Sequence, residues 1–156
     1  MPFAFGISGF IPESVALQSG RIMLGRLREL SARRATFALE TTLAGRTHAP
    51  WIRSLLQGGC DFHLMYLWLR SADLAVQRVR ARVRKGGHDV PEDFIRKRYR
   101  LGIRNFFELY QALAATWAVY DSSATRSPIL VAQGERPDQI SVYRADLWQN
   151  VCEGRE

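Results

Sequence analysis

The side chains best suited to chemistry in this chain are the arginines and lysines between Arg70 and Arg104. Eleven basic residues fall in these positions against four carboxylates, and the resulting net charge of +7 equals the formal net charge of all 156 residues. We call residues 70–104 the basic window. A field concentrated in one segment attracts polyanions, above all phosphate. The alternative, on charge alone, is a solvated basic face without a ligand.

The composition of the basic residues excludes one kind of phosphate site. Twenty of the 22 basic residues are arginines, and the two lysines are Lys85 and Lys97. A Walker A loop needs a Gly-Lys pair followed by Ser or Thr, because the lysine reaches the phosphates and the hydroxyl holds Mg²⁺. Arg84 and Arg96 precede the two lysines, so the sequence contains no P-loop. The three histidines are isolated, and no metal site is expected.

The elements that must position the basic window alternate between helix and strand. Apolar residues at helical spacing and short β-branched or aromatic runs distinguish the two kinds of element. The predicted helices are 12–33, 47–57, 72–85, 91–99, 103–116 and 145–151, and the predicted strands are 36–42, 61–69, 117–121 and 129–133. This alternation predicts one α/β domain with a mostly parallel sheet.

The helix over 72–85 carries the first half of the basic window. Ser71 is a good N-cap for this helix, and Gly86-Gly87 is a good C-cap. Its valines recur at helical spacing as a buried stripe, so Arg78 and Arg82 are expected on the opposite side.

Length and composition indicate a cytoplasmic protein. The 156 residues suit a single domain, and a hydrophobic content of 47% argues against disorder. No run of about 18 uncharged apolar residues exists, so no membrane span is expected. The N-terminus lacks the basic region and cleavage site of a signal peptide. Cys60 and Cys152 have no motif spacing, and a disulfide is not expected in a reducing compartment.

Several segments of the chain resemble, in order and spacing, the zeta-toxin-like P-loop kinases, a family also described as predicted ATPases. The resemblance extends from about Ile7 to Val151, and its most specific parts are ETTL, GGHxVPE and NFFELY. The matching segments are FALETTLAGR (37–46), YLWL (66–69), RVRARVRKGGHDVPE (78–92), IRKRY (95–99), NFFELY (105–110) and YDSS (120–123).

The resemblance implies ATP- and Mg²⁺-dependent phosphoryl transfer to a small hydroxyl-bearing acceptor. In the best known members of the family the acceptor is a UDP-activated amino sugar. The implied fold is a P-loop kinase-like three-layer sandwich with a mostly parallel sheet and a helical basic lid. An antitoxin protein is implied as a partner.

The same resemblance assigns the acceptor site to the segment after the strand predicted at 36–42. Glu40, Thr41 and Thr42 would sit at the end of that strand, where open α/β sheets bind ligands. Glu40 would take hydrogen bonds from acceptor hydroxyls, and Arg46 would support Glu40 or the acceptor. The structural alternative for Glu40 is a residue that caps the next helix.

By the same resemblance, arginines of the lid neutralise the transferring phosphoryl group. Arg82 and Arg98 would act in catalysis, because charge spreads over the equatorial oxygens in the transition state. Arg78, Arg84 and His88 would be further phosphate contacts. The alternatives are a surface position for Arg84 and a role in loop architecture for His88.

The resemblance also indicates residues near the nucleotide, whereas helical spacing assigns three aromatic residues to the core. Asp121 and Ser122 resemble the family's segment near the adenine, although the family usually has Asn at the position of Ser122. Phe106, Phe107 and Tyr110 read as core residues at helical spacing rather than as a platform for stacking bases.

The N-terminus departs from the family. There a strand, the P-loop, its helix and a second strand ending in an acidic residue precede the segment that matches residues 6–14. The acidic position, the usual general base, falls at or before Met1, so about one βαβ unit of roughly 30 residues is missing. We therefore expect residues 1–156 to form one domain without that unit, to be inactive and to bind ATP-Mg²⁺ weakly.

Two further expectations follow. Without the central P-loop strand, the strands at 36–42 and 61–69 lack a neighbour, which predicts self-association through them. The alternative function is a nonenzymatic module that binds phosphate or nucleic acid through the basic window, with affinity that falls steeply with salt. Nucleic acid is not the partner that the kinase resemblance favours.

Overall fold

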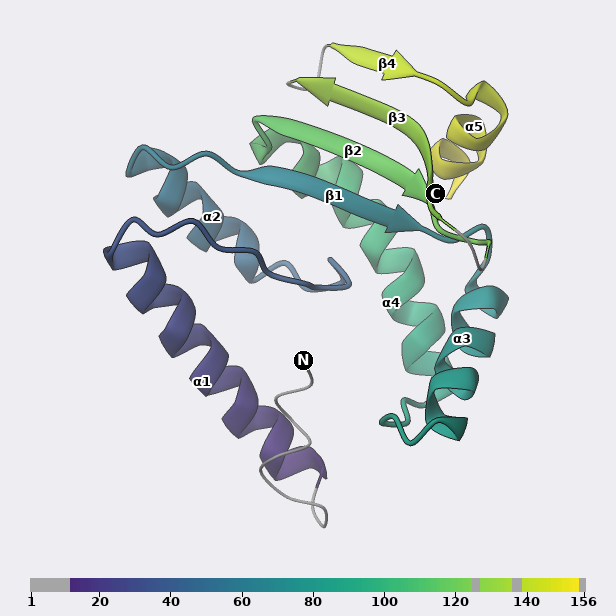
Figure 1. Cartoon of the computed structure of the whole chain (residues 1–156), viewed down its shortest axis with the longest axis horizontal. Coiled ribbons are helices and arrows are strands. Elements are labelled where there is room, and N and C mark those ends of the chain that lie inside the picture. The colour runs from purple at the N-terminus through teal and green to yellow at the C-terminus, as the bar shows by residue number, and fades with distance from the viewer. Residues whose placement is uncertain (1–11, 125–126, 136–138, 155–156) are drawn as a thin grey trace. The chain divides into compact units, whose positions relative to one another are not determined.

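The structure is a computed structural model that describes residues 12–124, 127–135 and 139–154, with side chains from Arg21 on (Figure 1). The chain divides into two compact units, residues 1–39 and residues 40–156. No helix among the described residues is long and apolar enough to cross a membrane.

The described part of the first unit is dominated by one helix, α1 (Pro12–Ala32), which confirms the helix predicted at 12–33. Glu29 pairs with both Arg26 and Arg33 along its exposed side. Such pairs three and four residues apart add only a few tenths of a kcal/mol each.

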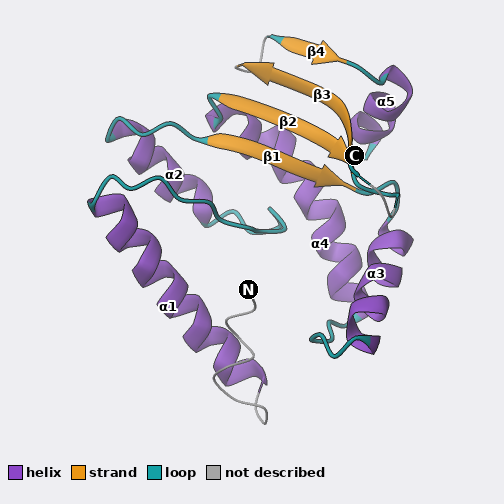
Figure 2. Ribbon diagram, in the orientation of Figure 1, coloured by secondary structure: helices purple, strands orange, loops and turns teal. Residues whose placement is uncertain are grey.

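The second unit is built on a four-stranded open sheet of order β1-β2-β3-β4 (Figure 2). Its strands are β1 (His63–Trp68), β2 (Thr116–Asp121), β3 (Ile129–Glu135) and β4 (Ile140–Val142). β1 and β2 are parallel, whereas β2 and β3, and β3 and β4, are antiparallel. The mixed α/β class is therefore confirmed, while the parallel character of the sheet is only partial. Short connections explain this, because a parallel return requires a crossover of a dozen residues or more.

Four α-helices of the described second unit agree closely with prediction at their starts. They are α2 (His48–Gln57), α3 (Ala72–Arg84), α4 (Glu92–Asn105) and α5 (Ala145–Glu153). Ser71 caps α3 as expected, with its Oγ accepting a hydrogen bond from the Leu74 amide at 3.1 Å. Gly86 has the positive φ of 84° that the turn after α3 requires.

The helices predicted at 91–99 and 103–116 form one continuous helical stretch, which ends at Leu113, before the predicted limit at 116. α4 runs through Gly102 and continues as a π-helix (Phe106–Tyr110) and a 3₁₀ turn (Gln111–Leu113) before β2 begins. Gly102 lies within this helix, and its lack of a side chain allows the backbone at Thr42 to approach closely.

The core lies on one face of the sheet. Alternate residues of β1 and β2 point into it, among them Leu64, Trp68, Trp117 and Val119. Buried side chains of α2, α4, the π-helix and α5 pack against them, and α4 runs behind the strands in Figure 1. On the other face of β1, Met65 and Leu67 are 66% and 54% exposed. The strand predicted at 61–69 is thus confirmed, and its side chains alternate between a buried and an exposed face.

The strand predicted at 36–42 does not form. Residues 35–42 contain no strand, and the division between the two units falls after Leu39, inside the predicted range. A strand is stable only when its amides and carbonyls pair with a neighbour. No neighbouring strand pairs with this segment in the described part of the chain. An apolar, β-branched sequence was therefore not sufficient to form a strand here.

Candidate functional site

The segment Glu40–Arg46 contains the acceptor site predicted from the resemblance, and we call it the acceptor loop for that prediction. It is tied to α4 and to the π-helix after it. Asn105, which is 1% exposed, donates its side-chain amide to the carbonyls of Leu43 at 2.8 Å and Ala44 at 3.1 Å. The Tyr110 hydroxyl donates to the Gly45 carbonyl at 2.5 Å. Buried hydrogen bonds of this kind are expensive to break, because each leaves a carbonyl without a partner. The loop therefore has one fixed path over the helix.

Close backbone packing explains why residue 102 is glycine. A Cβ added at Gly102 would lie 2.6 Å from the carbonyl oxygen of Thr42 and 3.3 Å from the Tyr66 hydroxyl. Real side chains do not tolerate the first contact, so any other residue would push the acceptor loop away from α4. Glycine at position 102 therefore allows the acceptor loop to pack directly on α4.

A left-handed residue sets the shape of the acceptor loop. Leu43 has φ 55° although it is not glycine, and its amide donates to the Thr41 hydroxyl at 3.3 Å. Such a conformation costs about 1–3 kcal/mol. Burial of the Leu43 side chain, which is 5% exposed, offsets that cost. The side chains of Glu40, Thr41 and Thr42 remain exposed.

Arg46 closes the loop through an ion pair. Its guanidinium lies 3.4 Å from Glu108, which also accepts a 2.7 Å hydrogen bond from Arg104. These bonds, above all the one from Arg104, lower the pKa of the Glu108 carboxyl. Arg46 therefore supports the end of the loop that docks on the helix, and no contact joins it to Glu40.

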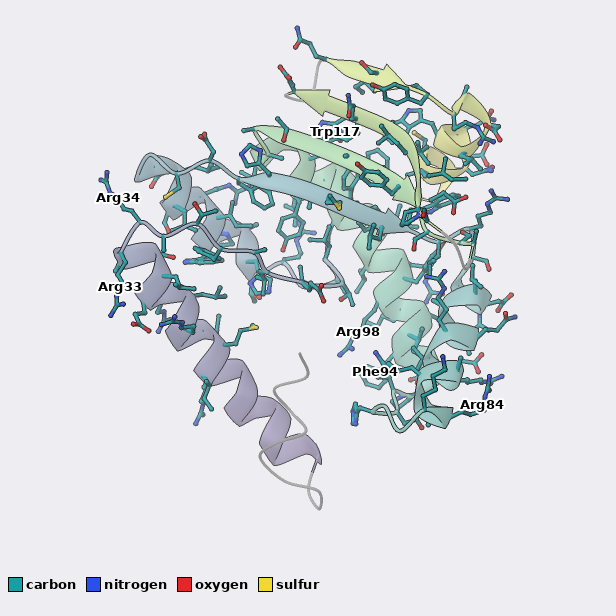
Figure 3. The ribbon with its side chains drawn as sticks, in the orientation of Figure 1. Arg33, Arg34, Arg84, Phe94, Arg98 and Trp117 are labelled. Carbon is teal, nitrogen blue, oxygen red and sulfur yellow. The ribbon has the colours of Figure 1, made fainter. Side chains whose placement is uncertain are left out.

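One flank of α4 faces the acceptor loop. Residues three and four apart share a side of a helix, so Phe94, Arg98 and Leu101 form one row with Asn105, the residue that holds the loop. Phe94 and Arg98 are exposed, and Figure 3 shows both projecting on the side of α4 away from α3. We call this row the open flank. Within the described residues, Arg98 has no carboxylate or hydrogen-bond partner.

The other flank of α4, which we call the paired flank, packs toward α3. Arg96 lies 2.7 Å from Glu92 and 2.6 Å from Asp73, and Arg80 lies 2.8 Å from Glu92. The hydrogen bond from Arg96 is the main reason that the pKa of Glu92 is lowered. The positive charge of these arginines is matched within the protein.

Two arginines of α3 bind backbone carbonyls. Arg78 donates to the Ser122 carbonyl, to the Ser122 hydroxyl at 3.4 Å and to the Ala124 carbonyl at 3.4 Å. Arg82 donates to the His88 carbonyl at 3.1 Å. Gly87 permits that contact, because a Cβ there would lie 2.5 Å from Arg82 Cγ. Both side chains thus hold loops, and each guanidinium keeps further donors for a ligand.

Asp121 at the carboxyl end of β2 is a buried carboxylate paired with the half-exposed Arg70. Arg70 binds it through Nε at 2.9 Å and through a second nitrogen at 2.8 Å, and the Ser123 amide donates at 2.9 Å. Burial alone would raise the pKa of Asp121, but the bonds from Ser123 and Arg70 outweigh it and lower the pKa. Asp121 and Ser122 are therefore both engaged inside the protein.

A hollow of about 400 Å³ lies between α3 and α4. Its floor is apolar, from Val76, Val79 and Ile95, and Arg84 stands on its rim. Arg84 is exposed at the end of α3 (Figure 3) and has no charged partner within the described residues. No three His, Cys, Asp or Glu side chains of the described ranges group closely enough to hold a metal ion.

The structure thus brings together only part of the predicted site. Thr42 and Arg98 come to one flank of α4, at Gly102 and one turn before it. Sequence reasoning missed Gly102 and assigned Tyr110 only to the core, although Tyr110 both packs there and holds Gly45. The available signal was a polar Asn at the start of the apolar run NFFELY, since a buried amide must find partners.

A comparison with known proteins finds one similar protein of undetermined role. An uncharacterized protein of Haemophilus influenzae is 27% identical to this chain over 88 residues. Those residues are 56% of this chain and 63% of the relative, so the chain covers less than two thirds of that protein's length. No family model matches the chain. No solved structure matches it.

Proposed function

We propose that this chain is the acceptor-binding and lid portion of an ATP-dependent phosphotransferase that acts on a small hydroxyl-bearing metabolite, such as a UDP-activated amino sugar. The observation that carries the proposal is the acceptor loop, fixed over Gly102 beside the unmatched charge of Arg98. Hydroxyl-binding groups and an available guanidinium then share one flank of a rigid helix. The resemblance to zeta-toxin-like kinases supports the same reading.

Each group has a role in that reaction. Glu40 accepts hydrogen bonds from acceptor hydroxyls, and Thr41 and Thr42 offer further polar contacts. Arg98 neutralises the charge of the phosphoryl group in flight. Arg82 adds a second guanidinium through the donors that its bond to the His88 carbonyl leaves available. Arginines in such positions are worth about 10³ to 10⁵ in rate in related phosphoryl transfers.

The proposed reaction also needs a cradle for the triphosphate of ATP and for Mg²⁺. The 156 residues contain no Gly-Lys pair that could form one. We expect these residues by themselves to bind ATP-Mg²⁺ no more tightly than a generic basic surface would, and to transfer no phosphate. An antitoxin partner and a cytoplasmic location belong to the same proposal.

A nonenzymatic phosphate- or nucleic-acid-binding module is the second candidate. It is favoured by the exposed side chains of the basic window that have no partner in the described part of the chain, namely Arg84, Lys85, Lys97, Arg98 and Arg100. A polyanion that binds this surface releases counterions, so its affinity would fall steeply with salt. A small phosphate ligand bound mainly at Arg98 would show a shallow salt dependence.

Calorimetry with inorganic pyrophosphate tests the first candidate. Arg98→Gln should weaken binding at least about tenfold, because a hydrogen-bonded guanidinium is lost. Arg100→Gln is the matched control: it removes the same charge from the same helix, at an exposed position about 160° around the axis. Equal weakening by both variants would reject a localised site and support the general basic surface.

A further inference from the structure

The hollow between α3 and α4 has an apolar floor, and none of the residues that line it belongs to the acceptor loop or to the open flank. Its volume of about 400 Å³ lies in the range of small-molecule sites in proteins. On the floor, Val76 and Ile95 are buried, while Val79 and Val83 remain partly exposed. A polar group placed on these side chains would lose its hydrogen bonds to water, so the floor accepts hydrocarbon.

Four charged side chains are among the residues that line the hollow. Arg80 of α3 and Glu92 of α4 bind each other at 2.8 Å, so their charges are matched. Asp89 accepts a hydrogen bond from the Val90 amide at 2.8 Å. Arg84 is exposed and has no partner within the described residues. The cation available to an anionic group that enters the hollow is therefore Arg84.

The apolar floor and this arginine are ordered along α3. The lining residues of α3 run from Val76 to Arg84, a distance of about 12 Å along the helix axis. Arg84 is the last residue of α3, and Figure 3 shows it at that end of the helix. Val79 and Val83 lie between the two ends at helical spacing. A linear aliphatic chain with a carboxylate at one end has the same order of parts.

We propose that the hollow between α3 and α4 binds a medium-chain aliphatic carboxylate, with its chain on the valine floor and its carboxylate on Arg84. A planar guanidinium can donate two parallel hydrogen bonds to a carboxylate, which favours this head group. A short chain would leave most of the valines uncovered, and a long chain would extend past Val76. The proposal gives Arg84, a phosphate contact by resemblance, a different ligand, and it uses none of the residues assigned to phosphoryl transfer.

A chain-length series tests the role of the floor. Butyrate, hexanoate and octanoate have the same head group, and each added methylene that reaches the floor should tighten binding by up to about fourfold. Calorimetric titration of the full chain at one ionic strength measures the three affinities. Equal affinities would mean that surface charge alone binds these carboxylates, and the proposal would be overturned.

The head group is tested with octanoate and octanamide, which has the same chain without the charge. Arg84→Gln should weaken octanoate binding at least about fivefold, because charge-assisted hydrogen bonds are lost, and should change octanamide binding less than about twofold. Arg100→Gln removes the same charge from an exposed position on α4 and should change neither affinity. Equal losses for both ligands in Arg84→Gln would contradict a carboxylate at this arginine.

Asp89 supplies a second test of the head group. Asp89→Asn removes a negative charge from the rim of the hollow, so octanoate should bind more tightly than to wild type. Weaker octanoate binding by Asp89→Asn would overturn the proposal, because a carboxylate ligand gains nothing from a neighbouring carboxylate.

Val79→Thr tests where the chain lies. Threonine keeps the shape of valine but places a hydroxyl on the floor, so octanoate binding should weaken severalfold. Val142→Thr, at a 44% exposed valine of β4, is the matched control and should leave the affinity unchanged. The melting curve of each variant separates lost binding from lost folding. Wild-type octanoate affinity in folded Val79→Thr would reject the hollow as the site.

Discussion

Both flanks of α4 carry an arginine, but only the arginine of the paired flank is bound by carboxylates of the protein. On the paired flank, Arg96 is bound by Glu92 and Asp73, and Arg80 reaches across from α3 to the same Glu92. On the open flank, Arg98 has no partner among the described residues, and Phe94 leaves most of its ring in solvent. Arg96 and Arg98 are only two positions apart along the helix.

This difference teaches that the charge of a segment does not identify its binding residues. The basic window has a net charge of +7, yet much of its positive charge is already matched by carboxylates or carbonyls. Exposed ion pairs add little stability, so the carboxylates of the paired flank act mainly to cancel charge. What remains of the basic window for an external anion is the charge of Arg98 on the open flank, of Lys97 and Arg100 elsewhere on α4, and of Arg84 and Lys85 at the end of α3.

The largest effect should come from filling the space at Gly102. In Gly102→Ala the new methyl group meets the Thr42 carbonyl, so the acceptor loop must leave α4. We expect a loss of about 1–3 kcal/mol of unfolding free energy and faster amide exchange in the loop. Chemical denaturation and hydrogen exchange measure these quantities.

Gly25 provides the control for that substitution. It lies in α1, and a Cβ there would meet nothing within 4 Å. Gly25→Ala should therefore raise helix stability by up to about 1 kcal/mol, from helix propensity alone. If both substitutions stabilised the protein, the acceptor loop would not be seated on Gly102, and the open flank would have no fixed neighbour.

The next effect concerns the hydrogen bonds of Asn105. Asn105→Ala leaves the buried carbonyls of Leu43 and Ala44 without their donor, at a cost of about 1–3 kcal/mol. Pyrophosphate binding should weaken only modestly, since Arg98 is unchanged. Denaturation curves and calorimetry on the same preparation separate stability from affinity. An unchanged denaturation midpoint would contradict the buried-donor role.

Local signals predicted most of the elements of this fold. Ser71 and Gly86 give α3, and the apolar and aromatic run at 61–69 gives β1, close to their observed limits, because capping, turn geometry and strand propensity act over a few residues. The strand predicted at 36–42 failed because pairing depends on a neighbour, which its own sequence does not report. β4 was missed because three residues give almost no periodicity.

For the candidate site, the family resemblance selected Thr42 and Arg98, and the site itself stays a prediction. Which arginines are already bound depends on tertiary contacts, such as Arg78 with the Ser122 carbonyl, and the sequence does not report those contacts. Self-association stays a prediction. β1 has a partner on one edge only within the described sheet, and light scattering of wild type against Met65→Lys would test pairing through that edge.

Removing the carboxylate of Glu92 should leave arginines of the paired flank available to an external anion, as Arg98 is on the open flank. In Glu92→Gln, Arg80 loses its carboxylate, and Arg96 keeps only Asp73. We expect a small fall in melting temperature and a second, weaker pyrophosphate site by calorimetry. Glu153→Gln is the control and should add no site, because its carboxylate accepts from Gln149 and has no arginine partner within the described residues. A single site in both variants would mean that carboxylates do not decide which arginines bind.

The smallest expected effect is the pH dependence of that same group. Hydrogen bonding by Arg96, with the nearby charges of Arg96 and Arg80 opposed by Asp73, lowers the pKa of Glu92 in the folded protein. A lowered folded pKa means that Glu92 stabilises the fold above its unfolded pKa of about 4.3, and that this contribution is lost as the pH falls through the folded pKa. The difference in melting temperature between wild type and Glu92→Gln should therefore be largest at neutral pH and disappear as the solution is acidified below about pH 4.

Because other carboxylates titrate in both proteins, the difference between the two melting curves isolates Glu92. A gap that stayed constant down to pH 2 would show that the substitution acts through packing, and the contrast between the flanks would then not rest on charge.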